Sequence, residues 1–117
     1  SPFFIVLLLW YPCFENLFSI IRKFKLGRSP VTPDSNHFHQ LLFYFFKKKF
    51  KISNLTCNNY SSITINFYNF VILFFGSYNI YNTQLLVILI LINTIIYTVI
   101  YLKLFKFKYR ILISDKK

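Results

Sequence analysis

The side chains in this sequence that could do chemistry lie close together, between Arg28 and His39. The chain has 117 residues but only three acids and two histidines. This short stretch holds one of the acids, Asp34, and both histidines, His37 and His39. Histidine donors beside an arginine, at the start of a helix, are typical of an anion-binding site. The stretch therefore predicts a site for a phosphate-bearing ligand.

The two histidines allow other interpretations. Zinc binding would need a third ligand at a suitable spacing, and the cysteines, Cys13 and Cys57, are remote in the sequence. A histidine nucleophile or base would need a partner that nothing in the sequence supplies. The histidines could also be ordinary residues at a membrane surface, beside a helix N-cap. Anion binding fits the residues better than metal binding or catalysis, and the surface interpretation stays open.

A short amphipathic helix is expected to position the histidines. Gly27, Pro30 and Pro33 exclude a continuous helix before it, and Asp34 or Ser35 is expected to cap it. Apolar side chains then recur at helical spacing over about three turns. They are Phe38, Leu41, Leu42, Phe45 and Phe46. This helix is too short to cross a membrane and ends in three lysines, so we expect it to lie in the membrane interface.

Long, nearly uncharged stretches predict an all-α, polytopic membrane protein. The apolar content of 56% exceeds the roughly 45–50% of soluble domains. Stretches near residues 3–21, 60–76 and 85–103 are long enough to cross the hydrocarbon core as helices. Within the first of them, Glu15 is the only charged residue. We therefore expect three transmembrane helices, in one membrane-embedded unit, and the short interfacial helix between the first two.

The distribution of basic residues predicts the orientation. Residues 22–51 carry eight basic side chains against one acid, residues 103–117 carry six against one, and residues 77–84 carry none. Basic segments stay on the cytoplasmic side, so loop 22–55 and tail 104–117 are expected there. The net charge of +11 favours anionic lipid and phosphorylated substrates. A soluble nucleic-acid-binding protein would not need such apolar stretches, so nucleic acid is not expected as a partner.

Several residues around the predicted loop follow one another in a recognisable order. They are Tyr11-Pro12-Cys13-Phe14-Glu15, Ile21-Arg22-Lys23, Gly27-Arg28-Ser29-Pro30, Pro33-Asp34 and His37-Phe38-His39-Gln40-Leu41. This order resembles the C-terminal signature of the polyprenyl-phosphate sugar-1-phosphate transferases, of the glycosyltransferase family 4 type. The spaced histidine pair is most similar to that of the bacterial undecaprenyl-phosphate N-acetylglucosamine-1-phosphate transferases. The resemblance covers about a third of the chain.

The resemblance implies a reaction and a place in the cell. A UDP-sugar would give a sugar-1-phosphate to undecaprenyl phosphate at the bacterial inner membrane, with Mg²⁺ as cofactor. The product would serve cell wall or lipopolysaccharide synthesis. The resemblance implies that Arg28, Asp34, His37 and His39 contribute to the sugar-nucleotide site, within loop 28–40.

The same resemblance implies that part of the enzyme lies elsewhere. The acids of the family that handle magnesium and the nucleophile lie in earlier cytoplasmic loops, so no catalytic or metal-binding residue is expected here. The chain starts at Ser1 without a methionine, and we interpret it as the C-terminal part of a longer protein that is inactive by itself. The alternative is a non-catalytic polytopic protein or transporter fragment whose basic loop anchors it to anionic lipid.

Overall fold

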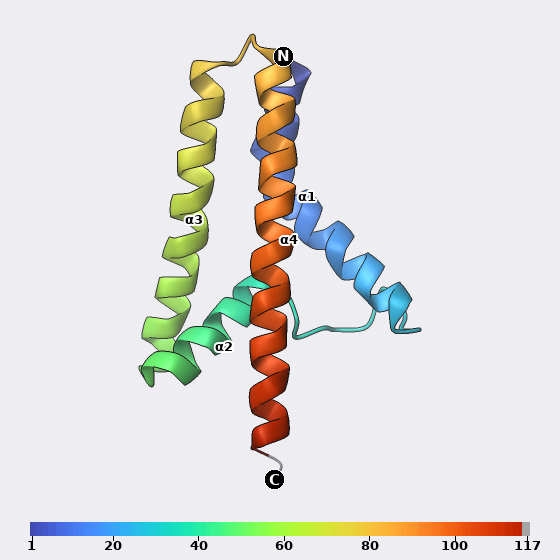
Figure 1. Cartoon of the computed structure of the whole chain (residues 1–117), viewed down its shortest axis with the longest axis vertical. Helices are drawn as coiled ribbons and strands as arrows, with labels where there is room; N and C mark the ends of the chain where they lie inside the picture. Colours follow the sequence, from blue (N-terminus) through green and yellow to red (C-terminus); the bar gives the residue numbers. More distant parts are fainter. Residues whose placement is uncertain (116–117) are drawn as a thin grey trace.

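The computed structural model describes residues 1–115, and all of the regular structure in that range is helical. The four helices are α1 (Pro2–Lys25), α2 (Phe38–Phe50), α3 (Asn54–Tyr78) and α4 (Thr83–Ser114). Figure 1 shows α3 and α4 joined by a short turn near the N-terminus, while α2 crosses between them further down. The expected all-α fold is confirmed.

α1 bends part-way along its length, because it contains an internal proline. Ser1 caps the helix by accepting a hydrogen bond from the N–H of Phe3. Pro12 lacks an N–H and its ring collides with the preceding turn, which bends a helix. Figure 1 shows the second half of α1 turning away from α4. The helix stops before Gly27, whose φ of +64° lies in the left-handed region that favours glycine.

α2 starts later than the sequence predicted. Its N-cap is His37, in an extended conformation, and neither Asp34 nor Ser35 caps it. The reason is that the Asp34 carboxylate accepts the N–H of Asn36 and pairs with Arg22, so it closes a turn before the helix. The side chains of Phe38, Leu41 and Leu42 are buried, while those of Phe45 and Phe46 are half-buried. The predicted apolar stripe therefore faces the other helices.

Two helices, α1 and α4, are long and apolar enough to cross a membrane. Among the residues that the structure describes, α3 does not meet the same test. It starts at Asn54, and its asparagine, serine and threonine side chains lower its mean hydropathy. α4 continues to Ser114, well past residue 103 where its span was expected to end. Its 32 residues give a length of about 48 Å, more than the roughly 30 Å of a hydrocarbon core.

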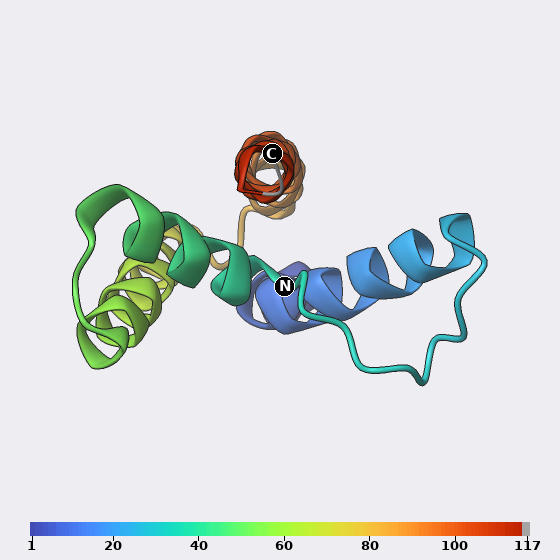
Figure 2. The same cartoon turned by 90° about the horizontal axis from the view of Figure 1, so that it is seen from below.

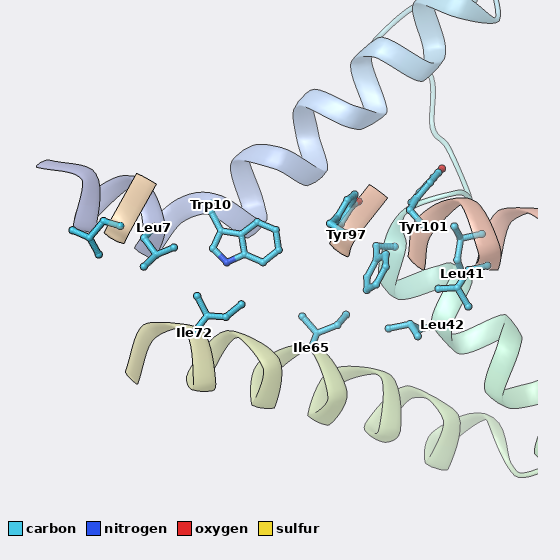
Figure 3. Close-up of a cluster of buried hydrophobic side chains, with 11 residues drawn as sticks. Leu7, Trp10, Leu41, Leu42, Ile65, Ile72, Tyr97 and Tyr101 are labelled. Carbon is cyan, nitrogen blue, oxygen red and sulfur yellow. The ribbon is translucent and has the colours of Figure 1, made fainter. Parts of the chain in front are cut away.

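The four helices share one apolar core. It consists of Leu7, Trp10, Phe38, Leu41, Leu42, Ile65, Ile72, Leu86, Tyr97, Tyr101 and Leu104. Figure 3 shows Leu7 and Trp10 of α1 opposite Ile65 and Ile72 of α3. Many large apolar side chains lie outside this core and are exposed, for example Phe67 and Phe70 of α3 and Ile95 of α4. Exposed apolar surface on this scale fits hydrocarbon surroundings better than water.

Candidate functional site

Arg22, near the end of α1, anchors the loop that carries the predicted site. Its guanidinium forms an ion pair with Asp34 and hydrogen bonds with the hydroxyl of Tyr101 and, at 3.1 Å, the carbonyl of Asn36. The two side chains of the ion pair are only 11% and 9% exposed. A buried pair is tolerated when other hydrogen bonds satisfy it, and the N–H of Asn36 donates to Asp34 at 3.0 Å.

The surroundings of Asp34 keep it ionised. Burial alone would raise the pKa of this carboxyl. The hydrogen bond and positive charge of Arg22, together with the N–H of Asn36, outweigh burial and hold the pKa below its ordinary value of 3.8. At neutral pH the carboxylate is therefore charged and available to hold the loop against α1.

α4 holds the same loop from the other side. The Lys108 ammonium donates to the carbonyl of Ser35 at 2.9 Å and to the side-chain oxygen of Asn36 at 2.8 Å. The Tyr101 hydroxyl donates to the carbonyl of Asn36 at 2.9 Å. Burial lowers the pKa of Lys108 from its ordinary value. Asn36 is buried as a result, and the end of the loop is fixed between α1 and α4.

Glu15 links α1 to the start of α2. Its Oε1 accepts the N–H of Phe38 at 2.6 Å and lies 3.1 Å from the Nδ1 of His37. Its Oε2 accepts the hydroxyl of Tyr97 at 2.7 Å. A carboxylate in an apolar region is costly unless several donors surround it, and here they come from α2 and α4. Glu15 thus adds to the local cap of α2, in which the side-chain oxygen of Gln40 accepts the N–H of His37 at 3.3 Å.

The two histidines converge. His37 has extended backbone angles at the N-cap and His39 is the second residue of α2, so the 200° separation of a regular helix does not apply between them. Their rings are nearly parallel, at 16°, with centroids 6.0 Å apart. His37 is half-buried against Glu15, while His39 is exposed. His39 thus exposes its imidazole to solvent, whereas Glu15 holds the imidazole of His37.

Arg28 does not join this group. Its backbone N–H donates to the carbonyl of Lys23, and within residues 1–115 its side chain makes no hydrogen bond or ion pair. Figure 2 shows the loop returning from the far end of α1 to the start of α2. Arg28 follows closely after Lys25, the last residue of α1, so it lies at that far end. The arginine that contacts the loop is Arg22, which lies in the basic cluster after the first apolar stretch.

The sequence alone also missed Glu15, Asn36 and two tyrosines of α4. A signal for Glu15 was available, because it is the single charged residue in a long apolar stretch, and such residues are costly and often functional. Tyr97 and Tyr101 are four residues apart, so both side chains lie on one face of α4. Nothing in the sequence indicates which helix that face contacts.

The acids of this chain do not fit a magnesium site. Mg²⁺ prefers carboxylate oxygens and bound water in an octahedral arrangement. Glu15 is occupied by three donors, Asp34 pairs with Arg22, and Asp115 pairs with Lys48 at 2.9 Å. Over the part of the chain that the structure describes, no three histidine, cysteine or acidic side chains lie together. We therefore assign no metal chemistry to these residues.

Comparisons with known protein families, with curated proteins and with solved structures find no match to this chain. The function has to be argued from the residues and their geometry.

Proposed function

We propose that this chain forms the sugar-nucleotide-binding loop of a membrane transferase. The enzyme would transfer a sugar-1-phosphate, with N-acetylglucosamine as the sugar, from a UDP-sugar to undecaprenyl phosphate. The observation that carries the proposal is the convergence of His37 and His39 at the start of α2. The order of residues around them, which resembles the sugar-1-phosphate transferases, supports the same function. The bacterial inner membrane and the synthesis of cell-envelope polysaccharide belong to this proposal.

The geometry suits the binding of a diphosphate. His39 is exposed at the first turn of α2, where its ring can donate a hydrogen bond to a phosphate oxygen. His37 lies beside it with a parallel ring. The loop before them is already fixed by Arg22, Asp34 and Lys108, so little conformational entropy is lost when a ligand binds.

In the proposed reaction, an oxygen of the lipid phosphate attacks the β-phosphorus of the UDP-sugar. A new P–O bond forms there, the bond from the β-phosphorus to the oxygen that bridges to the α-phosphate breaks, and UMP leaves. The residues of this chain would hold the diphosphate in line for the attack. Mg²⁺, when bound to the enzyme, would neutralise phosphate charge. Its carboxylate ligands would come from residues outside this chain.

The proposal includes three membrane spans. They lie near residues 3–21, 60–76 and 85–103, with loop 22–55 and tail 104–117 on the cytoplasmic side. The exposed phenylalanines of α3, among them Phe67, Phe70 and Phe74, support its contact with lipid. The length of α4 supports a helix that crosses the hydrocarbon core and carries its basic end, with Lys106, Lys108 and Arg110, beyond it.

Direct titration tests the proposed ligand. UDP-GlcNAc would be added to the 117-residue chain in lipid nanodiscs, and binding followed by calorimetry. We expect saturable binding that weakens about 10–100-fold in His39→Ala, the worth of one charge-assisted hydrogen bond. His39 suits this test because its ring is exposed, so its removal leaves the buried network in place.

Lys49→Ala is the matched control. It removes an exposed cation from the opposite end of α2, and its binding should equal that of the wild-type chain. Equal losses in both variants would mean that only general positive charge is involved. Absence of saturable binding by the wild-type chain would favour the non-catalytic membrane protein, whose lysines Lys47, Lys48 and Lys49 anchor α2 to anionic lipid.

A further inference from the structure

We infer that Glu15 is a positioning residue, which holds His37 as the tautomer with its proton on Nδ1 and so presents Nε2 as the reactive atom of the ring. The inference depends on the proposed function only for the identity of the ligand that Nε2 meets. The arrangement of the carboxylate and the ring stands on its own contacts.

The carboxylate of Glu15 is held in one orientation by partners on two other helices. Oε2 accepts the hydroxyl of Tyr97 from α4 at 2.7 Å. Oε1 accepts the N–H of Phe38 at 2.6 Å, at the start of α2. The same Oε1 lies 3.1 Å from Nδ1 of His37. The side chain of Glu15 is only 12% exposed, so water competes little for these contacts.

This contact selects one form of the imidazole. An ionised carboxylate only accepts hydrogen bonds, so the ring nitrogen that faces it must carry a proton. The contact therefore assigns the proton of the neutral ring to Nδ1 of His37. Nε2, on the opposite side of the ring, is then free to accept a hydrogen bond. An acid that fixes the tautomer of a functional histidine from behind is a recurring arrangement in enzyme and metal sites.

The position of Glu15 explains why an acid occurs within this apolar stretch. It lies three residues after Pro12, where α1 bends. The bend occurs next to the start of α2, and both oxygens of Glu15 are used there.

Nitrogen NMR of the chain without any ligand tests the inference. The 117-residue chain would be labelled with ¹⁵N-histidine and placed in nanodiscs at about pH 8, where an ordinary histidine is largely neutral. Long-range proton–nitrogen spectra identify which ring nitrogen carries the proton. We expect His37 to be protonated at Nδ1, whereas exposed His39 averages both tautomers. A His37 ring with a bare Nδ1 and a protonated Nε2 overturns the inference, and this result needs no variant.

Two variants separate positioning from packing. Glu15→Met keeps the length of the side chain but has no oxygen that accepts a hydrogen bond from Nδ1, so the Nε2–H tautomer of His37 should become populated. Tyr97→Phe removes a hydrogen bond from the same carboxylate but leaves the contact with His37, so the tautomer should stay unchanged. An unchanged tautomer in a folded Glu15→Met chain would contradict the inference.

Binding measurements distinguish this inference from the proposed function. If UDP-GlcNAc binds, Glu15→Met should weaken its binding at least about tenfold, while Tyr97→Phe should weaken it by a smaller factor. If the wild-type chain does not bind UDP-GlcNAc, the proposed function fails. The tautomer of His37 in the ligand-free chain still decides whether Glu15 positions the ring.

Discussion

Removal of the charge of Asp34 should release the loop that carries the histidines. Asp34→Asn keeps the shape of the side chain and an oxygen that can accept the N–H of Asn36, so it removes mainly the charge opposite Arg22. Loss of one partner of a buried pair costs about 3–5 kcal/mol. About a tenth of the surface of each side chain is still exposed to solvent, so we expect a cost at the lower end of that range, about 3 kcal/mol.

Hydrogen exchange in nanodiscs measures this loss directly. Each 1.4 kcal/mol changes an equilibrium constant about tenfold, so the population of the open loop should increase about 100-fold. Exchange should accelerate by that factor at the amides of Asn36 and Phe38, which donate to Asp34 and Glu15. A helix whose contacts do not involve the loop, such as the first half of α3, should exchange at the wild-type rate.

The matched control is Asp115→Asn. It is the same substitution in an exposed ion pair with Lys48, whose side chains are 41% and 57% exposed. Solvent screens such a pair, so exchange in the loop should not change. The reasoning about Asp34 is refuted if loop exchange in Asp34→Asn stays within about twofold of the wild type.

The same comparison has a definite pH dependence. The pKa of Asp34 in the folded chain lies below its ordinary value of 3.8. Its contribution to stability is therefore complete above that value and is lost as the pH falls through the folded pKa. The difference in exchange between wild type and Asp34→Asn should persist from neutral pH down to about pH 4 and shrink below it.

Two predictions concern packing and topology. A methyl group added at Gly76 would lie 2.5 Å from Cδ2 of buried Leu7, so Gly76→Ala should destabilise the chain by about 1–3 kcal/mol in detergent unfolding. The cost should fall when Leu7→Ala provides room, and equal costs in both backgrounds would contradict the close contact. In a background without the native cysteines, Ser35→Cys and Tyr81→Cys should react with impermeant thiol reagents from opposite sides of the membrane. Labelling of both from one side would disprove the proposed spans.

The sequence was sufficient for the helices, because their signals are local. Apolar stretches and helical spacing predicted the all-α fold and the apolar stripe that starts at Phe38. That this stripe packs against the other helices was not predicted. Gly27 and the two prolines predicted the break after the first helix. The span expected near residues 85–103 lies within α4, which continues to Ser114.

The site was only partly accessible from the sequence. The histidines and Asp34 stood out as rare polar residues in an apolar, basic chain. Asp34 could either cap a helix or pair with a cation, and the sequence does not distinguish the two roles. The position of Arg22 beside the loop decided for the ion pair. The contact could not be predicted, because it depends on how the loop returns along α1.

What the sequence determined by itself is which residues share a helix and a face, since the period of a helix fixes their relative directions. Only the tertiary structure decided which faces meet. Glu15 is 22 residues from His37 and 82 from Tyr97, and the bend of α1 and the rotation of α4 bring these three side chains together. Contacts between helices depend on the packing of the whole core, so the partners of Glu15 could not be read from its own apolar stretch.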